Sequence, residues 1–457
     1  MQLKISAQIL LVGALSGCAA YAPKPLPNQV NLPRSAASIS LDPSRLPFRS
    51  LSSHTFNPAD GLDMDEVAML AVANNPQLKQ ARDALGIARA QSFAAGLLPD
   101  PQLGVTADHP TNGTAGNTNG FNFSLNYDVN ALLQRSSRKG AAQAAAQKVN
   151  LDLLWQEWQI VSQTRLLFTQ LTAQKALMAQ LQAARKLLAD RYSRTQQALT
   201  AGNVTLDMAS ADLIALQNTE RQINDLERSR LKNRASLNGL LGLEATTHLQ
   251  LVGEPHATLL DATAVQKNLL ERLNQRPDML ALQAGYHSQE EKFRGAILAQ
   301  FPALNVGLTR ARDTSGLYTM GFGMTLSLPI FNRNRGNIAI ENATRKQLFD
   351  AYQERLNSAY NEVAIALENQ PLLQSQLQRT REGERQLKIV AQRAQAAFQA
   401  GNLAAADYVR LQTALLDKQT EAINLQEALM EQQIALETLL GPDLPAQSHI
   451  RRTNNAP

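Results

Sequence analysis

Ala201-Gly202-Asn203-Val204 and Ala400-Gly401-Asn402-Leu403 decide the fold of this chain, because each lies near the middle of a long helix-prone run. The two glycines are 199 positions apart. Glycine and asparagine tolerate positive φ, so each Gly-Asn pair can end one helix and turn the chain back into another. We interpret the two stretches as the tips of helical hairpins in a duplicated unit.

Other landmarks recur in the same order, first at an offset of 201 residues and later at 199. A constant offset over most of a chain is the signature of an internal repeat. The matched segments are Pro76-Gln77-Leu78 with Pro277-Asp278-Met279, Pro101-Gln102-Leu103 with Pro302-Ala303-Leu304, and Leu240-Leu241-Gly242 with Leu439-Leu440-Gly441. The body of the protein is therefore predicted to be two copies of one unit.

Each half contains a segment that alternates apolar and polar residues, at 121–129 and 320–328. Alternation with period two predicts a strand with one apolar face, and partner strands are expected near 102–108 and 303–309. Strands of about ten residues suit a tilted span of a membrane. The apolar positions expected to meet lipid include Phe121, Phe123, Leu125, Phe322, Met324 and Leu326.

A chain with two β-hairpins cannot close a barrel alone. Because lipid does not tolerate unpaired strand edges, four membrane strands would require several chains to form a ring, and three chains would give about twelve strands. The other interpretation is a pair of two-stranded ribbons packed on soluble helices. The pattern leaves both open.

The longest predicted helices flank the two tips. The run from Arg135 to Ala198 would be about 95 Å long at 1.5 Å per residue, which is far beyond a globular helix. Its apolar residues recur at mixed steps of three and four, as in a coiled coil. The second half repeats the pattern over 335–400 and 407–440. The expected fold is mainly α with a small β part.

The N-terminal residues resemble an export signal. A short basic start and an apolar core end in Leu15-Ser16-Gly17-Cys18, which resembles a lipobox, with Cys18 as the lipidated residue. An ordinary signal peptide with an incidental cysteine is the alternative. We expect a signal peptide over 1–17 and a proline-rich, extended tether over 18–60. The remaining boundaries are 61–242 and 264–441 for the two repeats, 243–263 for their connection and 442–457 for a tail.

Composition excludes several classes of function. A net charge of +5 over 457 residues is too diffuse to indicate nucleic-acid binding. Six scattered histidines and one cysteine offer little for a metal site, and no phosphate-binding loop or nucleophile motif is present. We therefore expect no catalytic residues, no metal ligands and no cofactor beyond a covalent lipid on Cys18. A further alternative is a hydrolase built on a helical frame. Its only support is that many chains of this length are enzymes.

The ordered landmarks resemble the TolC-like outer-membrane efflux family, whose members are exit ducts of tripartite exporters. The resemblance covers about 61–441 and rests on the two Gly-Asn tips, the two Leu-Leu-Gly ends and three further segments. These are the segment from Leu62 to Leu78, Arg276-Pro277-Asp278, and Leu326-Ser327-Leu328-Pro329-Ile330-Phe331-Asn332. The stretches 95–103 and 329–336 look most like the branch that serves heavy-metal cation exporters.

The resemblance implies a homotrimer in the outer membrane, with a twelve-stranded barrel and a periplasmic tunnel of long helices. Its tips would dock a periplasmic adaptor and an inner-membrane pump. The adaptor-docking residues implied are Gly202, Asn203, Val204, Gly401, Asn402 and Leu403. Two alternatives from neighbouring classes are a type I secretion exit duct and a lipid-tethered periplasmic coiled-coil scaffold.

The resemblance also points to the residues of a gate. Some family members carry two aspartates just after the second tip; Asp407 matches the first, but the second position is Arg410. Asp207 is a third candidate, after the first tip. A tyrosine–arginine lock found in some members has no counterpart, because those positions are Phe398 and Leu403. The alternative to a gating role is purely structural. Both aspartates lie in the first turn of a predicted helix, where they interact favourably with the helix dipole by about 0.3–1 kcal/mol.

Overall fold

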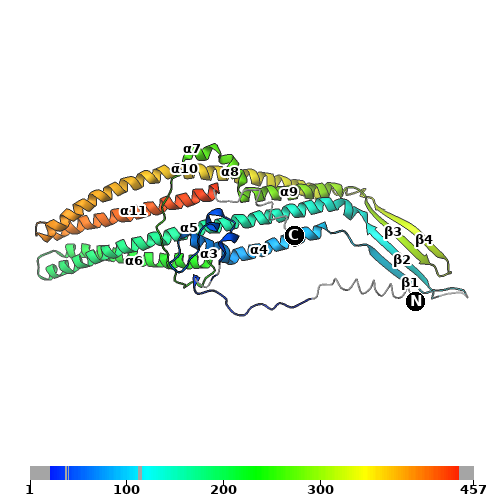
Figure 1. Cartoon of the computed structure of the whole chain (residues 1–457), viewed down its shortest axis with the longest axis horizontal. Helices are drawn as coiled ribbons and strands as arrows, with labels where there is room; N and C mark the ends of the chain where they lie inside the picture. The colour runs from blue at the N-terminus through cyan, green and yellow to red at the C-terminus, as the bar shows by residue number, and fades with distance from the viewer. Residues whose placement is uncertain (1–20, 37–38, 40, 112–115, 442–457) are drawn as a thin grey trace.

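The computed structural model describes residues 21–36, 39, 41–111 and 116–441. The molecule is elongated, with long helices through most of its length and one β-sheet at the opposite end from the helical tips (Figure 1). Cys18, the signal peptide and the tail over 442–457 lie outside the described residues.

The two halves repeat one order of elements, two short helices, two strands and a pair of long helices. In the first half these are α3 (Met64–Asn74), α4 (Pro76–Gly96), β1 (Gln102–Asp108), β2 (Gly120–Asp128), α5 (Val129–Thr200) and α6 (Leu206–Leu240). In the second they are α8 (Leu269–Gln275), α9 (Pro277–Leu298), β3 (Ala303–Arg312), β4 (Tyr318–Ser327), α10 (Arg335–Gln399) and α11 (Ala405–Leu440). A 3₁₀ turn (Pro43–Arg45), α2 (Arg49–Ser52) and α7 (Ala262–Lys267) lie outside this repeat.

The expected start of α5 was wrong by six residues. The helix was expected to begin at Arg135 and the strand before it to include Val129, but Asp128 ends β2 and caps α5 by accepting from the Ala131 amide. In the second half the helix begins at Arg335, as expected, directly after Arg333 and Asn334, which both have positive φ.

The four strands form one antiparallel sheet in the order β1-β2-β3-β4. The two predicted hairpins are thus joined through β2 and β3, where Leu125 pairs with Leu308. Because directly paired residues share a face, the register gathers nearly all large apolar side chains of the four strands on one side. That side, here called the apolar face, comprises Leu103, Val105, Ala107, Phe121, Phe123, Leu125, Tyr127, Leu304, Val306, Leu308, Arg310, Arg312, Tyr318, Met320, Phe322, Met324 and Leu326.

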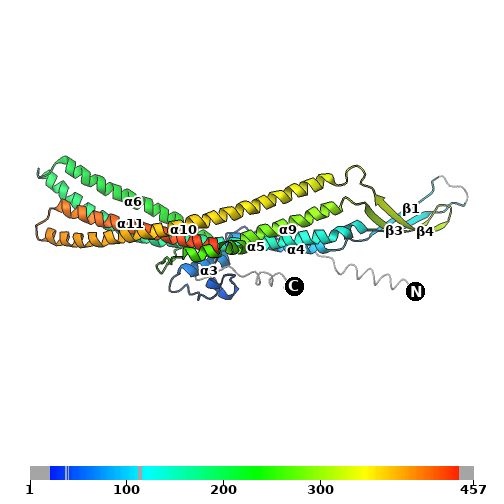
Figure 2. The same ribbon diagram turned by 90° about the horizontal axis from the view of Figure 1, so that it is seen from above.

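The core lies in the middle of the molecule, where α3 and α9 pack on α5 (Figure 2). Trp158 of α5 is buried there, and its indole nitrogen donates to the Thr438 carbonyl oxygen at 3.1 Å. Arg165 of α5 pairs with Asp65 of α3 at 2.7 Å and with Glu437 of α11 at 3.4 Å. These contacts hold the first repeat against the last helix.

The predicted tether is extended only over its first part. Residues 21–32 are exposed, but Phe48 and Leu51 are fully buried, and the Phe48 ring lies 5.1 Å from the Trp158 ring. The expectation of an extended tether over 18–60 was therefore wrong for its second half. Prolines also suit short turns and first helical positions, as Pro43 shows, and two apolar anchors are enough to dock such a segment.

Equivalent hydrogen bonds link the start of a shorter helix to the end of a long helix in the two halves. Asn75 directly precedes α4, and its side-chain amide nitrogen donates to the Leu240 carbonyl oxygen at 2.9 Å. Arg276, 201 positions later, directly precedes α9, and its guanidinium donates to the Leu439 carbonyl oxygen at 3.3 Å. The duplication has thus kept the link between the start of a short helix and the end of a long one, although the side chains differ.

Candidate functional site at the helical tips and the sheet

Both tips end their helices with the same turn. The amide of Gly202 donates to the Leu199 carbonyl and that of Asn203 to the Ala198 carbonyl, with Gly202 at φ +73°. These two bonds make a Schellman motif, which needs a residue tolerant of positive φ. Gly401 at φ +77° and Asn402 repeat it in the second half. The predicted tips are therefore turns of identical design.

The three gate candidates lie in the first turns after the tips, and the structure gives them different surroundings. Arg410 pairs with Asp407 at 3.0 Å, so the guanidinium offsets the charge of that carboxylate. Asp207 is exposed in the first turn of α6 and makes no side-chain hydrogen bond or ion pair with the described residues. Of the two aspartates, Asp207 is the one whose charge is not offset locally.

The structure shows a charge cluster near the first tip that the sequence analysis missed. Asp212 is buried, and it accepts from Arg191 at 2.7 Å and from the Thr195 hydroxyl at 2.7 Å. Arg191 stands eleven residues before Gly202 and Asp212 ten residues after it. Residues at matching distances from a hairpin tip face each other, so this count could have predicted the pair.

A cavity of about 250 Å³ separates the two tip hairpins, with walls from α5, α6, α10 and α11. Phe398 stands where a tyrosine was expected for the tyrosine–arginine lock. Its ring stacks on that of Tyr408, with ring centroids 4.8 Å apart and planes 2° from parallel. Both rings line the cavity, together with Asp212 and Arg191. The cavity is thus lined by an aromatic pair of the second tip hairpin and by a buried ion pair of the first.

At the other end, the sheet brings all six predicted strand residues onto its apolar face. Leu125 is joined to Phe322 through Leu308, which pairs with both. Many of these side chains are exposed in the isolated chain, including Phe322 at 70% and Met324 at 63%. An exposed apolar surface of this extent requires a cover of lipid or protein. The opposite face carries mainly Asn, Ser, Thr and Gly.

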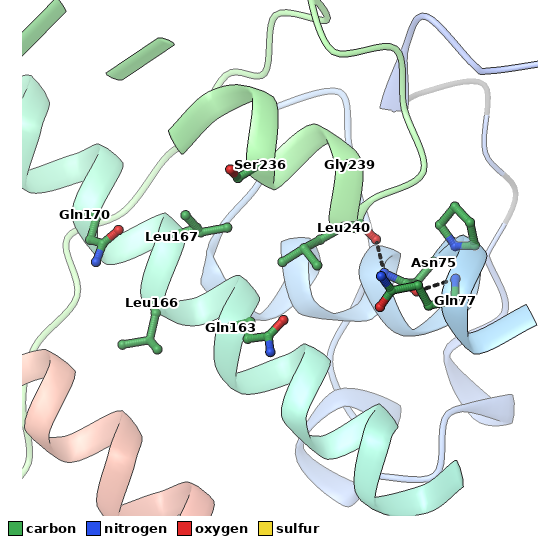
Figure 3. A pocket seen from close by; sticks show the side chains of 10 residues that line it. Asn75, Gln77, Gln163, Leu166, Leu167, Gln170, Ser236, Gly239 and Leu240 are labelled. Carbon is green, nitrogen blue, oxygen red and sulfur yellow. Dashed lines mark hydrogen bonds between the residues drawn. The ribbon is translucent and has the colours of Figure 1, made fainter. Parts of the chain in front are cut away.

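A groove of about 640 Å³ lies where the start of α4 meets α5 and the end of α6 (Figure 3). Leucine side chains and neutral amides form its walls, with Gln170 and Asn75 at opposite ends of the view. None of its lining residues is titratable, so the groove offers no group for acid–base chemistry.

A smaller cavity of about 190 Å³ lies between α5, α11 and the inter-repeat connection. Glu427 and Glu254 both line it. Partial burial raises the pKa of Glu427 to about 7, and the nearby Glu431 carboxylate adds to the effect. Glu427 therefore titrates near neutral pH.

Over the residues that the structure describes, no group of three or more His, Cys, Asp or Glu side chains could hold a metal ion. None of the helices in the same ranges is long and apolar enough to cross a membrane.

The chain is similar to known proteins of the outer membrane. Residues 269–442 match the family model described as outer membrane efflux protein. The cation efflux system protein CusC of Escherichia coli K12 is 25% identical over 292 residues, which span 59% of this chain and 61% of CusC. The probable outer membrane lipoprotein SilC of Salmonella typhimurium is 25% identical over 477 residues, covering 96% of this chain and 98% of SilC.

Solved structures agree with the fold over nearly the whole length. The Campylobacter jejuni CmeC outer membrane channel superposes with a TM-score of 0.71, at 17% identity, over 93% of this chain and 98% of CmeC. At this identity the likeness shows the fold. The aligned part spans only about three fifths of the first curated relatives, so activity, cargo and partners require their own argument.

Proposed function

We propose that this chain is the exit duct of a tripartite efflux system in the outer membrane, in keeping with its match to the outer membrane efflux protein family model and its similarity to SilC. The duct conducts cargo passively from the periplasm to the exterior. The observation that carries the proposal is an amphipathic sheet at one end of the molecule and paired helical hairpin tips at the other. A membrane barrel and a periplasmic tunnel need those two parts.

The assembly proposed is a homotrimer. The sheet has two edge strands, β1 and β4, and open edges are not tolerated in lipid. Pairing β4 of each copy with β1 of the next closes a barrel, and three copies of a four-stranded sheet give twelve strands. This number lies within the range of outer-membrane barrels, about 8 to 26 strands.

The partners proposed are a periplasmic adaptor at the tips and an inner-membrane pump behind it. The turn residues Gly202, Asn203, Gly401 and Asn402 are exposed, and they lie at the end farthest from the sheet (Figure 1). Adaptor binding opens the entrance by favouring a state in which the tip hairpins are separated. A covalent lipid on Cys18, outside the described residues, would anchor the chain to the same membrane.

The cargo class proposed is metal cations. Its support is the name of the first curated relatives, cation efflux system protein, and the sequence resemblance to the heavy-metal branch. A passive duct needs no cation site of its own for this role, since selection belongs to the pump.

The test is made in the native host. We expect the protein in the outer-membrane fraction as an oligomer that dissociates on heating, and a deletion strain that is more sensitive to heavy-metal salts than its parent. A protein found in the soluble fraction would overturn the proposed duct. A deletion strain sensitive to organic drugs but not to metals would overturn only the cargo.

A further inference from the structure

Two arginines interrupt the apolar face of the sheet, near its loop end. Arg310 and Arg312 occupy alternate positions of β3, so both side chains project from the side that carries Leu308 and Val306. Across the strands, Arg310 pairs with Phe123 and Met320, and Arg312 pairs with Phe121 and Tyr318, so both arginines have apolar or aromatic neighbours on this face.

Neither arginine forms an ion pair with an acidic residue among those that the structure describes. Of the carboxylates in the described strands, Asp108 and Asp128 lie on the polar face, by the alternation of β1 and β2. Asp313 is adjacent, but its carboxylate caps the turn, accepting from the amides of Ser315 and Leu317.

Arg310 is exposed and, among the described residues, forms no hydrogen bond or ion pair through its side chain. The Arg312 guanidinium lies 5.4 Å from the centre of the Tyr318 ring, while its buried Nε atom has no hydrogen-bond partner. Two cations thus lie two residues apart on the same face of β3, with donor groups still unused.

The position of the pair in a membrane follows from the proposed function, on which this inference rests. The apolar face would meet lipid, and Arg312 lies next to the loop that points away from the helices (Figure 1). A guanidinium in hydrocarbon is costly, whereas a long side chain can extend its head to the interface. On the side away from the periplasm, that interface belongs to the outer leaflet.

We propose that Arg310 and Arg312 together bind the phosphate groups of a phosphorylated glycolipid in the outer leaflet. A guanidinium presents planar, paired N–H donors that match phosphate oxygens, and such charge-assisted bonds are roughly twice as strong as neutral ones. Alternate residues of a strand are about 6.6 Å apart along the backbone, so two such guanidiniums can reach one phosphate or two neighbouring ones. The lipid chains would pack on Phe123 and Met320 beside them.

The experiment measures binding of lipid A, a glycolipid with two phosphates, to the full-length oligomer in detergent by native mass spectrometry. The test variant is Arg310→Gln with Arg312→Gln. Arg310→Lys with Arg312→Lys keeps the charge. The matched control, Arg228→Gln with Arg385→Gln, removes two arginines of the helical part that are 72% and 70% exposed.

We expect the glutamine pair to weaken lipid A binding by about tenfold or more, because it removes both charged donors. The lysine pair should bind with an affinity between wild type and the glutamine pair, because it keeps the charge but loses the paired donors, and the helical control should bind like wild type. Equal binding by wild type and the glutamine pair would overturn the proposal. Displacement of lipid A by millimolar inorganic phosphate would overturn the lipid as the source of the phosphate.

A second comparison needs only the wild-type protein and so does not depend on how the variants fold. Lipid A with both phosphates removed should bind about tenfold more weakly than the intact lipid. Equal affinities would contradict the inference while leaving the duct itself intact, since oligomer and outer-membrane location are measured separately.

Discussion

At the scale of single residues, Arg276 is a buried arginine that several partners hold in place. Its guanidinium is fully buried, grips Asp278 through two bonds of 3.0 and 2.8 Å, and lies 4.8 Å from the centre of the Trp155 ring. Asp278 also accepts from Arg355 at 3.0 Å. A buried ion pair adds little net stability, but removing one partner leaves an uncompensated charge in the core.

The change Arg276→Met should therefore lower the free energy of unfolding by about 3 kcal/mol, the low end of the usual cost because Arg355 remains beside Asp278. Arg276→Lys should not restore the loss, since an ammonium group cannot make the paired bonds. Denaturant unfolding of the purified protein measures both. Arg228→Met, at a 72% exposed side chain, is the control and should change stability by less than about 0.5 kcal/mol. Equal stabilities for Arg276→Met and this control would show that the buried pair is dispensable.

Glu427 gives a prediction about pH. Its pKa is raised from 4.5 to about 7, so the neutral carboxyl is favoured in the folded protein. The contribution of the neutral Glu427 carboxyl to the free energy of unfolding is fully present below pH 4.5 and is lost as the pH rises through about 7. Glu427→Gln should therefore be more stable than wild type near pH 8, by about 1 kcal/mol after allowing for solvent screening, and no different near pH 4.

Thermal unfolding at the two pH values tests this prediction. The control is Glu421→Gln, because the bonds from Lys418 and Thr380 lower the pKa of Glu421, so neutralising it should give no gain at pH 8. A Glu427→Gln variant that is equally stabilised at both pH values would point to packing rather than titration.

At the scale of elements, the tips carry the proposed gate. Arg410 offsets Asp407, whereas Asp207 has no partner among the described residues. Asp207→Asn should therefore reduce block of the channel by multivalent cations severalfold, and Asp407→Asn should reduce it less. Single-channel recording with a trivalent cation on the periplasmic side measures the difference. The converse ranking would show that the Arg410 pair opens in the assembled entrance.

The elements also show how far the sequence could be interpreted. Long periodic helices, alternating strands and Gly-Asn turns depend on local rules, so their existence was predictable. The strand β2 ends where Asp128 caps the following helix. Phe48 is buried because it contacts Trp158, which is distant in the sequence, and no local pattern reveals such a contact. The gate candidates were placed by resemblance, whereas the pair of Arg191 and Asp212 could have been found by counting residues from the predicted tip.

At the scale of the whole molecule, the duplication explains the architecture. Asn75 and Arg276 sit at equivalent positions and bind equivalent carbonyls, so each half closes its helices in the same way. The two hairpins then merge into one sheet through β2 and β3. In the single chain the outer edges of β1 and β4 have no partner strand, and in the proposed trimer they pair with neighbouring copies.

The number of copies in the membrane-extracted protein therefore tests the central claim most directly. Native mass spectrometry in mild detergent should give three chains per particle, with no monomer before heating, because each sheet needs two neighbours to close its edges. A stable monomer or dimer as the main species would contradict the account.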